Sequence, residues 1–95
     1  FGICCTNKNS QNFIYVSDYA NNLIRKFDEN LQQIKTFSVN KEDEIELNGP
    51  CSIAINYDLN QIQVIDQKNC RLVYFDLQTE SYLGQIILFQ EDISR

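Results

Sequence analysis

Residues 18–28, DYANNLIRKFD, recur 48 positions later as residues 66–76, DQKNCRLVYFD. Four positions are identical in the two copies and a fifth pairs two apolar residues; the pairs are Asp18 and Asp66, Asn21 and Asn69, Ile24 and Leu72, Phe27 and Phe75, and Asp28 and Asp76. Each copy opens with a polar turn, continues as an apolar run and closes with Phe-Asp. A fixed period of this length is the mark of a repeat architecture.

The repeat extends on both sides of this stretch. Residues 2–5, GICC, align with SIAI, and residues 13–18, FIYVSD, align with QIQVID. The offset between the copies is 50 at Ile3 and 48 at Asp18, so the loop in the first copy is two residues longer. We therefore expect two successive units, residues 1–48 with a linker at the end and residues 49–95. The chain opens inside a strand-like segment, which suggests excision from a longer protein.

Short apolar runs separated by polar turns predict β-strands near residues 1–5, 13–16, 23–27, 31–37, 51–56, 61–66, 71–75 and 81–88. Residues 7–12 and the charged stretch 38–48 are predicted to be loops. No helical periodicity is present. The inner runs are apolar on both faces, which indicates antiparallel sheets covered on both sides, as in a β-propeller. The expected fold class is all-β, with two consecutive four-stranded antiparallel meanders that form part of a propeller.

The repeated pattern resembles the NHL repeat, a β-propeller blade motif that runs roughly G-I-A-V-D, then I-Y-V-A-D, then x-x-N-x-x-I-x-x-F-D. Both copies match it in order, although the His that often follows the Asn is replaced by Asn22 and Cys70. The resemblance implies a four-stranded blade per repeat and about six blades in a closed ring. Two blades cannot close such a ring. It therefore implies partner blades in a longer parent chain, or self-assembly in which about three copies complete the ring.

The composition narrows the class of partner. The net charge is −5, from 13 acidic and 8 basic residues, and this balance disfavours nucleic acid, which needs clustered Lys and Arg. No run of 18 apolar residues occurs, so no membrane span is expected. No Asn-x-Ser/Thr acceptor is present, which slightly favours an intracellular location. A protein partner is the expectation that remains.

The residue types give little sign of reaction chemistry. Histidine is absent, and the four cysteines show no C-x-x-C spacing, so neither a cofactor nor a metal is expected. Cys4 and Cys5 align with core positions and are predicted to be buried thiols, whereas Cys70 lies in a turn and is predicted to be accessible. A disulfide through Cys51 and a reactive thiol remain open alternatives.

The repeated carboxylates are interpreted as turn-forming groups, because catalytic duty normally falls to one copy rather than to every repeat. A divalent ion held by Asp58, Asp66, Asn56 and Asn69 stays an open alternative. No catalytic residue is predicted.

Loops on a rigid scaffold are the usual binding surfaces. The candidate partner-binding residues are Glu42, Asp43, Glu44, Tyr19 and Tyr57. The expected function is a non-catalytic protein-interaction scaffold. The alternatives are an RNA-binding NHL propeller and a metal-dependent propeller hydrolase or lyase.

Overall fold

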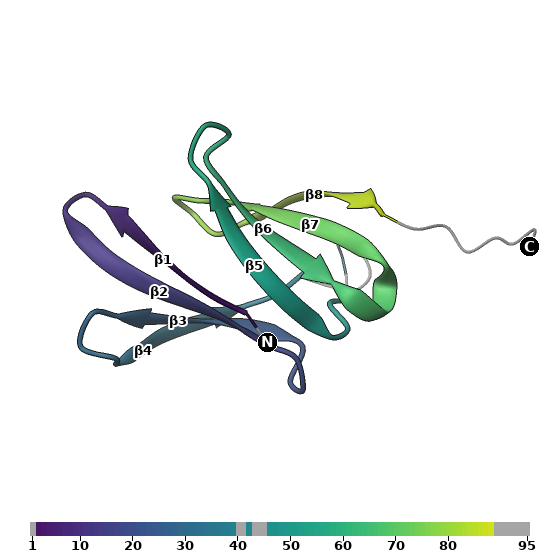
Figure 1. Cartoon of the computed structure of the whole chain (residues 1–95), viewed down its shortest axis with the longest axis horizontal. Coiled ribbons are helices and arrows are strands. Elements are labelled where there is room, and N and C mark those ends of the chain that lie inside the picture. Colours follow the sequence, from purple (N-terminus) through teal and green to yellow (C-terminus); the bar gives the residue numbers. More distant parts are fainter. Residues whose placement is uncertain (1, 40–41, 43–45, 89–95) are drawn as a thin grey trace, which may run out of the picture.

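The computed structural model describes residues 2–39, 42 and 46–88, and within them the chain forms two four-stranded antiparallel sheets (Figure 1). The first sheet contains β1 (Ile3–Lys8), β2 (Gln11–Asp18), β3 (Leu23–Asp28) and β4 (Gln33–Phe37). The second contains β5 (Pro50–Asn56), β6 (Gln61–Asp66), β7 (Arg71–Asp76) and β8 (Tyr82–Ile87). Each sheet follows the order of its strands in the chain. The predicted all-β class with two successive meanders is confirmed.

The two sheets repeat one another down to a local irregularity. The pairing of the third and fourth strands shifts between Lys26 and Phe27 in the first sheet and between Tyr74 and Phe75 in the second. These positions are 48 residues apart, like the sequence repeat itself. Because a bulge fixes the register of the strands around it, the residues of β3 and β4 have defined equivalents in β7 and β8.

The first hairpin differs from the expectation that residues 7–12 form a loop. β1 and β2 run through most of this segment, and Asn9 and Ser10 form the turn between them. Their φ angles are 52° and 69°, as a two-residue type I′ turn requires. The two extra residues of the first copy therefore lengthen a paired ladder. β4 likewise starts at Gln33, later than predicted, because Leu31 adopts a positive φ of 66° in the preceding turn.

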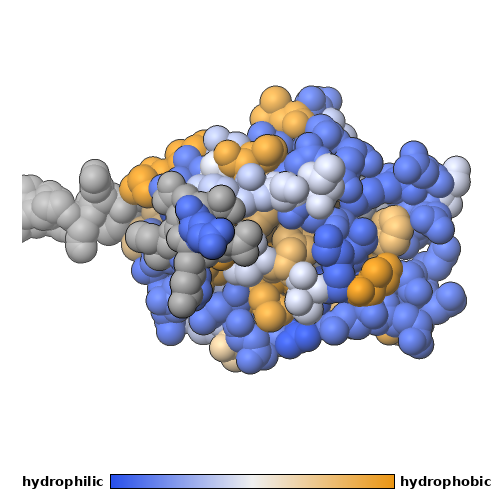
Figure 2. All heavy atoms as spheres, turned by 180° about the vertical axis from the view of Figure 1, so that it is seen from behind, coloured by the Kyte–Doolittle hydropathy of each residue, from blue (hydrophilic) through white to orange (hydrophobic). Residues whose placement is uncertain are grey.

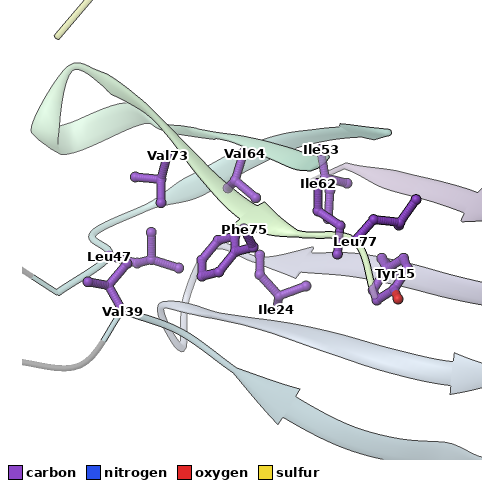
Figure 3. Close-up of a cluster of buried hydrophobic side chains, with 10 residues drawn as sticks. All are labelled: Tyr15, Ile24, Val39, Leu47, Ile53, Ile62, Val64, Val73, Phe75 and Leu77. Atoms are coloured by element: carbon purple, nitrogen blue, oxygen red, sulfur yellow. The ribbon is translucent and has the colours of Figure 1, made fainter. Parts of the chain in front are cut away.

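The sheets stack face to face, with β1 and β2 lying against β5 (Figure 1). Figure 3 shows the core between them, which consists of Tyr15, Ile24, Val39, Leu47, Ile53, Ile62, Val64, Val73, Phe75 and Leu77. The segment predicted as a charged linker supplies two of these residues, Val39 and Leu47. A row of edge-on aromatic contacts crosses the joint, with ring centroids 6.0, 5.2 and 6.3 Å apart along Tyr15, Phe37, Phe75 and Tyr82.

The two sheets present opposite faces to this joint. The first sheet contributes Tyr15 and Ile24, which are fully buried, while their equivalents Gln63 and Leu72 in the second sheet are only half-buried. The second sheet contributes Ile62, which is fully buried, while its equivalent Ile14 is half-buried on the outer face of the first sheet. The stacking is therefore head to tail rather than symmetric, and it leaves one face open on each sheet.

Candidate interaction surfaces

The Asp18 carboxylate organises the turn between β2 and β3. It accepts hydrogen bonds from the backbone N–H and the side-chain amide of Asn21, at 3.1 and 2.9 Å. Arg25 donates to it through Nε at 2.8 Å. These bonds, first that from the Asn21 side chain and then that from Arg25, lower the pKa of Asp18. The carboxylate is therefore ionised at neutral pH and engaged in its own turn.

The equivalent carboxylate, Asp66, is fully buried and accepts hydrogen bonds from the linker as well as from its own turn and strand β7. It accepts from Arg71 Nε at 2.8 Å, from the Asn69 side-chain amide at 2.8 Å and from the Asn48 backbone N–H at 2.7 Å. Asn69 ends the short 3-10 helix η1 (Gln67–Asn69), which replaces the simple turn of the first copy. The buried pair of Asp66 and Arg71 thereby fastens the entry into the second sheet to its β6–β7 connection.

The closing carboxylates, Asp28 and Asp76, each bind the turn that follows them. Asp28 accepts from two backbone N–H groups, at residues 30 and 32, at 2.9 and 3.0 Å. Asp76 accepts from the backbone N–H groups of Gln78 and Thr79 at 2.9 and 2.8 Å. The Thr79 backbone bond is the main cause of the lowered pKa of Asp76. The repeat also contains two apolar pairs, Ile24 with Leu72 and Phe27 with Phe75. Ile24 and Phe75 lie in the core, while Phe27 and Leu72 are half-buried on the open faces.

A buried ionic cluster joins the two sheets. Glu80, in the turn between β7 and β8, extends onto the first sheet and meets three lysines, with distances of 2.9 Å to Lys8 Nζ, 2.7 Å to Lys26 Nζ and 3.0 Å to Lys35 Nζ. The Tyr15 hydroxyl donates to the same carboxylate at 2.6 Å. The Glu80 side chain is 3% exposed. One acidic residue of the second sheet thus occupies a cradle of donors built by the first.

The cradle determines the charge of Glu80. Burial by itself would raise its pKa, but the hydrogen bonds from Lys26, Tyr15, Lys8 and Lys35 outweigh burial and lower the pKa to about 2. Burial also lowers the pKa of Lys8 and raises that of Tyr15, whose hydroxyl then stays protonated and donates to the carboxylate. The ionised glutamate is therefore the stable form across the neutral and mildly acidic range.

Sequence reasoning did not single out Glu80, and the repeat gave no signal for it. In the first sheet the equivalent turn position is Leu31, since both residues precede their fourth strand at the same distance from the bulge and both adopt left-handed backbone, with φ of 63° and 66°. The lysines carried no signal either, because a charge on a strand reads as a solvated position. Their convergence depends on the stacking of the two sheets.

Each sheet leaves one apolar face open. On the first sheet the open face carries Ile3, which is 66% exposed, together with half-buried Ile14, Val16 and Phe27. On the second sheet it carries half-buried Leu72 and Tyr74 and exposed Ile86. Seen from behind, the molecule shows several hydrophobic patches separated by hydrophilic surface (Figure 2).

The predicted partner-binding loops fall at opposite ends of the stack. Tyr19 lies in the β2–β3 turn, and the Ser38 hydroxyl donates to the Asn22 carbonyl at 3.2 Å, so the segment that leads to Glu42 starts at the same end. Tyr19 and Glu42 are exposed; Asp43 and Glu44 lie outside the described residues. Tyr57, also exposed, is at the other end and shares a 2.7 Å hydrogen bond with the Thr6 hydroxyl. The structure therefore does not bring the predicted loops into one surface.

The prediction for the adjacent cysteines was half wrong. Cys4 is half-buried beside the core, and burial, followed by the neighbouring Cys5, raises the pKa of its thiol to about 11. Cys5 is exposed, because it faces the open side of the first sheet, and it lines an open hollow of about 410 Å³ with Phe13 and Ile14. Cys70 is exposed in its turn as predicted, and Cys51 is half-buried.

The described residues were also examined for a metal-binding group and for a membrane-spanning helix. Within residues 2–39, 42 and 46–88, no three His, Cys, Asp or Glu side chains come together as a group that could hold a metal ion. In the same part of the chain, no helix has the length and apolar character to cross a membrane. Comparison with the models of known protein families and with curated proteins found no match.

Proposed function

We propose that this chain is a two-blade segment of an NHL-type β-propeller that serves as a non-catalytic scaffold for a protein partner. The head-to-tail stack carries this proposal. Two sheets of equal topology pack with unlike faces together, which is how repeat units build an extended architecture in which each contacts its neighbours. The four signature carboxylates support a structural role, since each accepts hydrogen bonds from its own turn or linker.

The end that carries Tyr19, where the segment leading to Glu42 also starts, is the binding surface that we propose. Tyr19 is held by two neighbours, since Lys68 Nζ lies 5.3 Å from its ring centroid and Gly49 packs closely against the ring. An anchored, exposed aromatic side chain offers contact area at low cost in conformational entropy. Glu42 and the overall charge of −5 favour a basic partner by electrostatic attraction.

The positive residues support a protein rather than a nucleic acid as the partner. Three of the eight Lys and Arg residues, Lys8, Lys26 and Lys35, converge on Glu80. A further two, Arg25 and Arg71, are paired with aspartates. These five cations therefore bind carboxylates of the fold, rather than forming the basic surface that a phosphate backbone requires.

A peptide-display selection tests the proposal. A library of random peptides is selected on the immobilised chain, and the enriched peptides are synthesised and titrated calorimetrically. We expect peptides with net positive charge whose affinity falls about tenfold in Tyr19→Ala and decreases with added salt. Tyr57→Ala, the same change at the opposite end, should leave the affinity unchanged. Failure to enrich any sequence, or equal losses in the two variants, would overturn the assignment.

A further inference from the structure

We infer that a second copy of this chain stacks the open face of its first sheet onto the open face of the second sheet, and so repeats between molecules the joint formed within each one. The inference deepens the proposed function, because it rests on treating the two sheets as stackable blades. The joint inside the chain acts as a template, because the residues that β2, β3, β6 and β7 contribute to it have equivalents on the two open faces.

The open face of the first sheet already carries the side chains that this joint requires. In the second sheet, Ile53 is 7% exposed because the first sheet covers it, whereas its equivalent Ile3 is 66% exposed. Phe75 and its equivalent Phe27 repeat this contrast, with the former fully buried and the latter half-buried. The residue types are the same, and coverage by a neighbouring sheet accounts for the difference in exposure.

The open face of the second sheet is apolar at the complementary positions. Ile24 and Phe37 are paired across β3 and β4 and pack in the internal joint. Their equivalents Leu72 and Ile86 are paired in the same way across β7 and β8. An apolar pair therefore lies at the position where the joint needs one, and Ile86 is exposed.

The turn between β7 and β8, which carries Glu80 across the internal joint, has a chemically different equivalent in the turn between β3 and β4, which carries Leu31. Inside the chain, Glu80 reaches onto the first sheet and is met there by Lys8 on β1, Lys26 on β3 and Lys35 on β4. At the equivalent positions of the outer joint, Leu31 would meet Tyr74 and Gly84. The acid has become an apolar residue, and the lysines on β3 and β4 have been replaced by uncharged residues. The third lysine, Lys8, lies in the part of β1 that only the first copy has, beyond the last pair of β5 and β6.

The turn residue and the surface that it would meet change together from charged to apolar. The Tyr74 ring covers Gly84 so closely that a Cβ there would lie 2.7 Å from the Tyr74 hydroxyl oxygen. An aromatic surface thus replaces the lysines, and Leu31, 70% exposed in the single chain, has the chemistry to bury against it. A second copy presents Leu31 at this position, which is why we assign that occupant.

A polar contact of the internal joint has a counterpart as well. The hydrogen bond between the Thr6 and Tyr57 hydroxyls links the first sheet to the β5–β6 loop of the second. The equivalents of these residues, 50 positions away, are Asn56 and Asn7, and two side-chain amides can also donate to and accept from each other. The outer joint therefore has a polar pair where the inner joint has one.

Head-to-tail contacts of this kind continue from copy to copy. They end in a closed ring if the rotation between copies closes, and in a filament if it does not. In either case the solution mass is a whole multiple of the 11.1 kDa chain.

Light scattering coupled to size exclusion, from about 1 µM to about 1 mM protein, tests the inference. We expect the parent chain to assemble and Leu31→Glu to remain at 11.1 kDa. The folded state tolerates glutamate in this turn, since Glu80 occupies the equivalent backbone conformation. The double variant with Leu31→Glu and Tyr74→Lys should assemble again, because it places the internal acid–lysine contact in the outer joint.

Leu83→Glu is the matched control. Leu83 is 52% exposed in the bulge of β8, and its equivalent Ile34 stays 47% exposed although the face of its own sheet is covered. This position therefore lies outside the joint, and the variant should assemble like the parent. Ile86→Glu provides a second interface variant should Leu31→Glu lose its β-sheet circular dichroism signal.

A parent chain that stays monomeric throughout the concentration range overturns the inference. So does a folded Leu31→Glu variant that assembles like the parent, or a Leu83→Glu variant that is disrupted equally. Peptide selection separates this result from the proposed function. A monomer that still selects basic peptides removes self-association and keeps the scaffold, while an assembly that selects none does the reverse.

Discussion

Replacing Glu80 by glutamine should remove a large part of the stability of the fold. The substitution keeps the shape of the side chain but removes its charge, and so it leaves Lys8 and Lys26, with side chains 7% and 12% exposed, without a buried counter-ion. Breaking a buried ion pair from one side costs about 3–5 kcal/mol, because the remaining charge is uncompensated. The same contacts lower the pKa of Glu80 from 4.5 to about 2, which corresponds to roughly 3 kcal/mol in favour of the ionised form.

Urea unfolding followed by circular dichroism at pH 7 measures this loss. A domain of this size has a total stability on the order of 5–14 kcal/mol, so about 3 kcal/mol is a substantial fraction. With a urea dependence of about 1–2 kcal/mol per molar, the midpoint should fall by about 1.5–3 M. Glu29→Gln, the same change at an exposed position in the β3–β4 turn, should alter stability by less than about 0.5 kcal/mol. A loss below about 1 kcal/mol in Glu80→Gln would refute the reasoning.

The same variant predicts a pH dependence. Because the pKa of Glu80 is lower in the folded chain than in the unfolded one, its contribution is fully present above about pH 4.5 and is lost as the pH falls through about 2. The difference in unfolding free energy between the parent chain and Glu80→Gln should therefore shrink across that interval. A difference that stays constant from pH 6 down to about pH 2 would show that the carboxylate charge is not its source.

Two further predictions follow from the paired groups and the thiols. Arg71→Ala should destabilise the chain by about 3–5 kcal/mol, because it leaves the buried Asp66 carboxylate without its counter-ion. Arg25→Ala should cost less than about 1 kcal/mol, because the side chains of Arg25 and Asp18 are 31% and 18% exposed. Urea unfolding midpoints compare the two variants, and equal losses would contradict the argument from burial. At pH 8, maleimide should modify Cys5 and Cys70 before Cys4, whose raised pKa leaves only about a thousandth of it as thiolate. Mass spectrometry of proteolytic fragments follows the labelling of each cysteine, and urea-unfolded protein serves as the control. Equally fast labelling of Cys4 and Cys5 in the folded chain would count against the burial of Cys4.

The strands and their order were predictable because they depend on local chemistry. Apolar runs bounded by Asp and Asn turns predicted the eight strands, and the 48-residue period predicted that the second sheet would repeat the first. The turn carboxylates bond to groups within a few residues of themselves, as Asp18 does with Asn21, so their surroundings follow from the nearby sequence.

Where local reasoning failed, neighbours distant in sequence or the detailed turn geometry decided the outcome. Cys5 was predicted to be buried because its equivalent faces the core, but it lies on the face that the single chain leaves uncovered. The 7–12 segment was predicted to be a loop from its polar composition, yet a two-residue turn allows the ladder to continue through it.

The sequence by itself determined the two units, their strands and the bonds within their turns, because these interactions join residues close along the chain. The tertiary structure alone decided that unlike faces of the two sheets meet. That choice brings Glu80 to Lys8, 72 residues away, and surrounds the buried Glu80 carboxylate with three lysines whose strand positions predict solvated side chains. The physical reason is that the alternation of side chains along a strand defines two faces, while only packing determines which of them is removed from water.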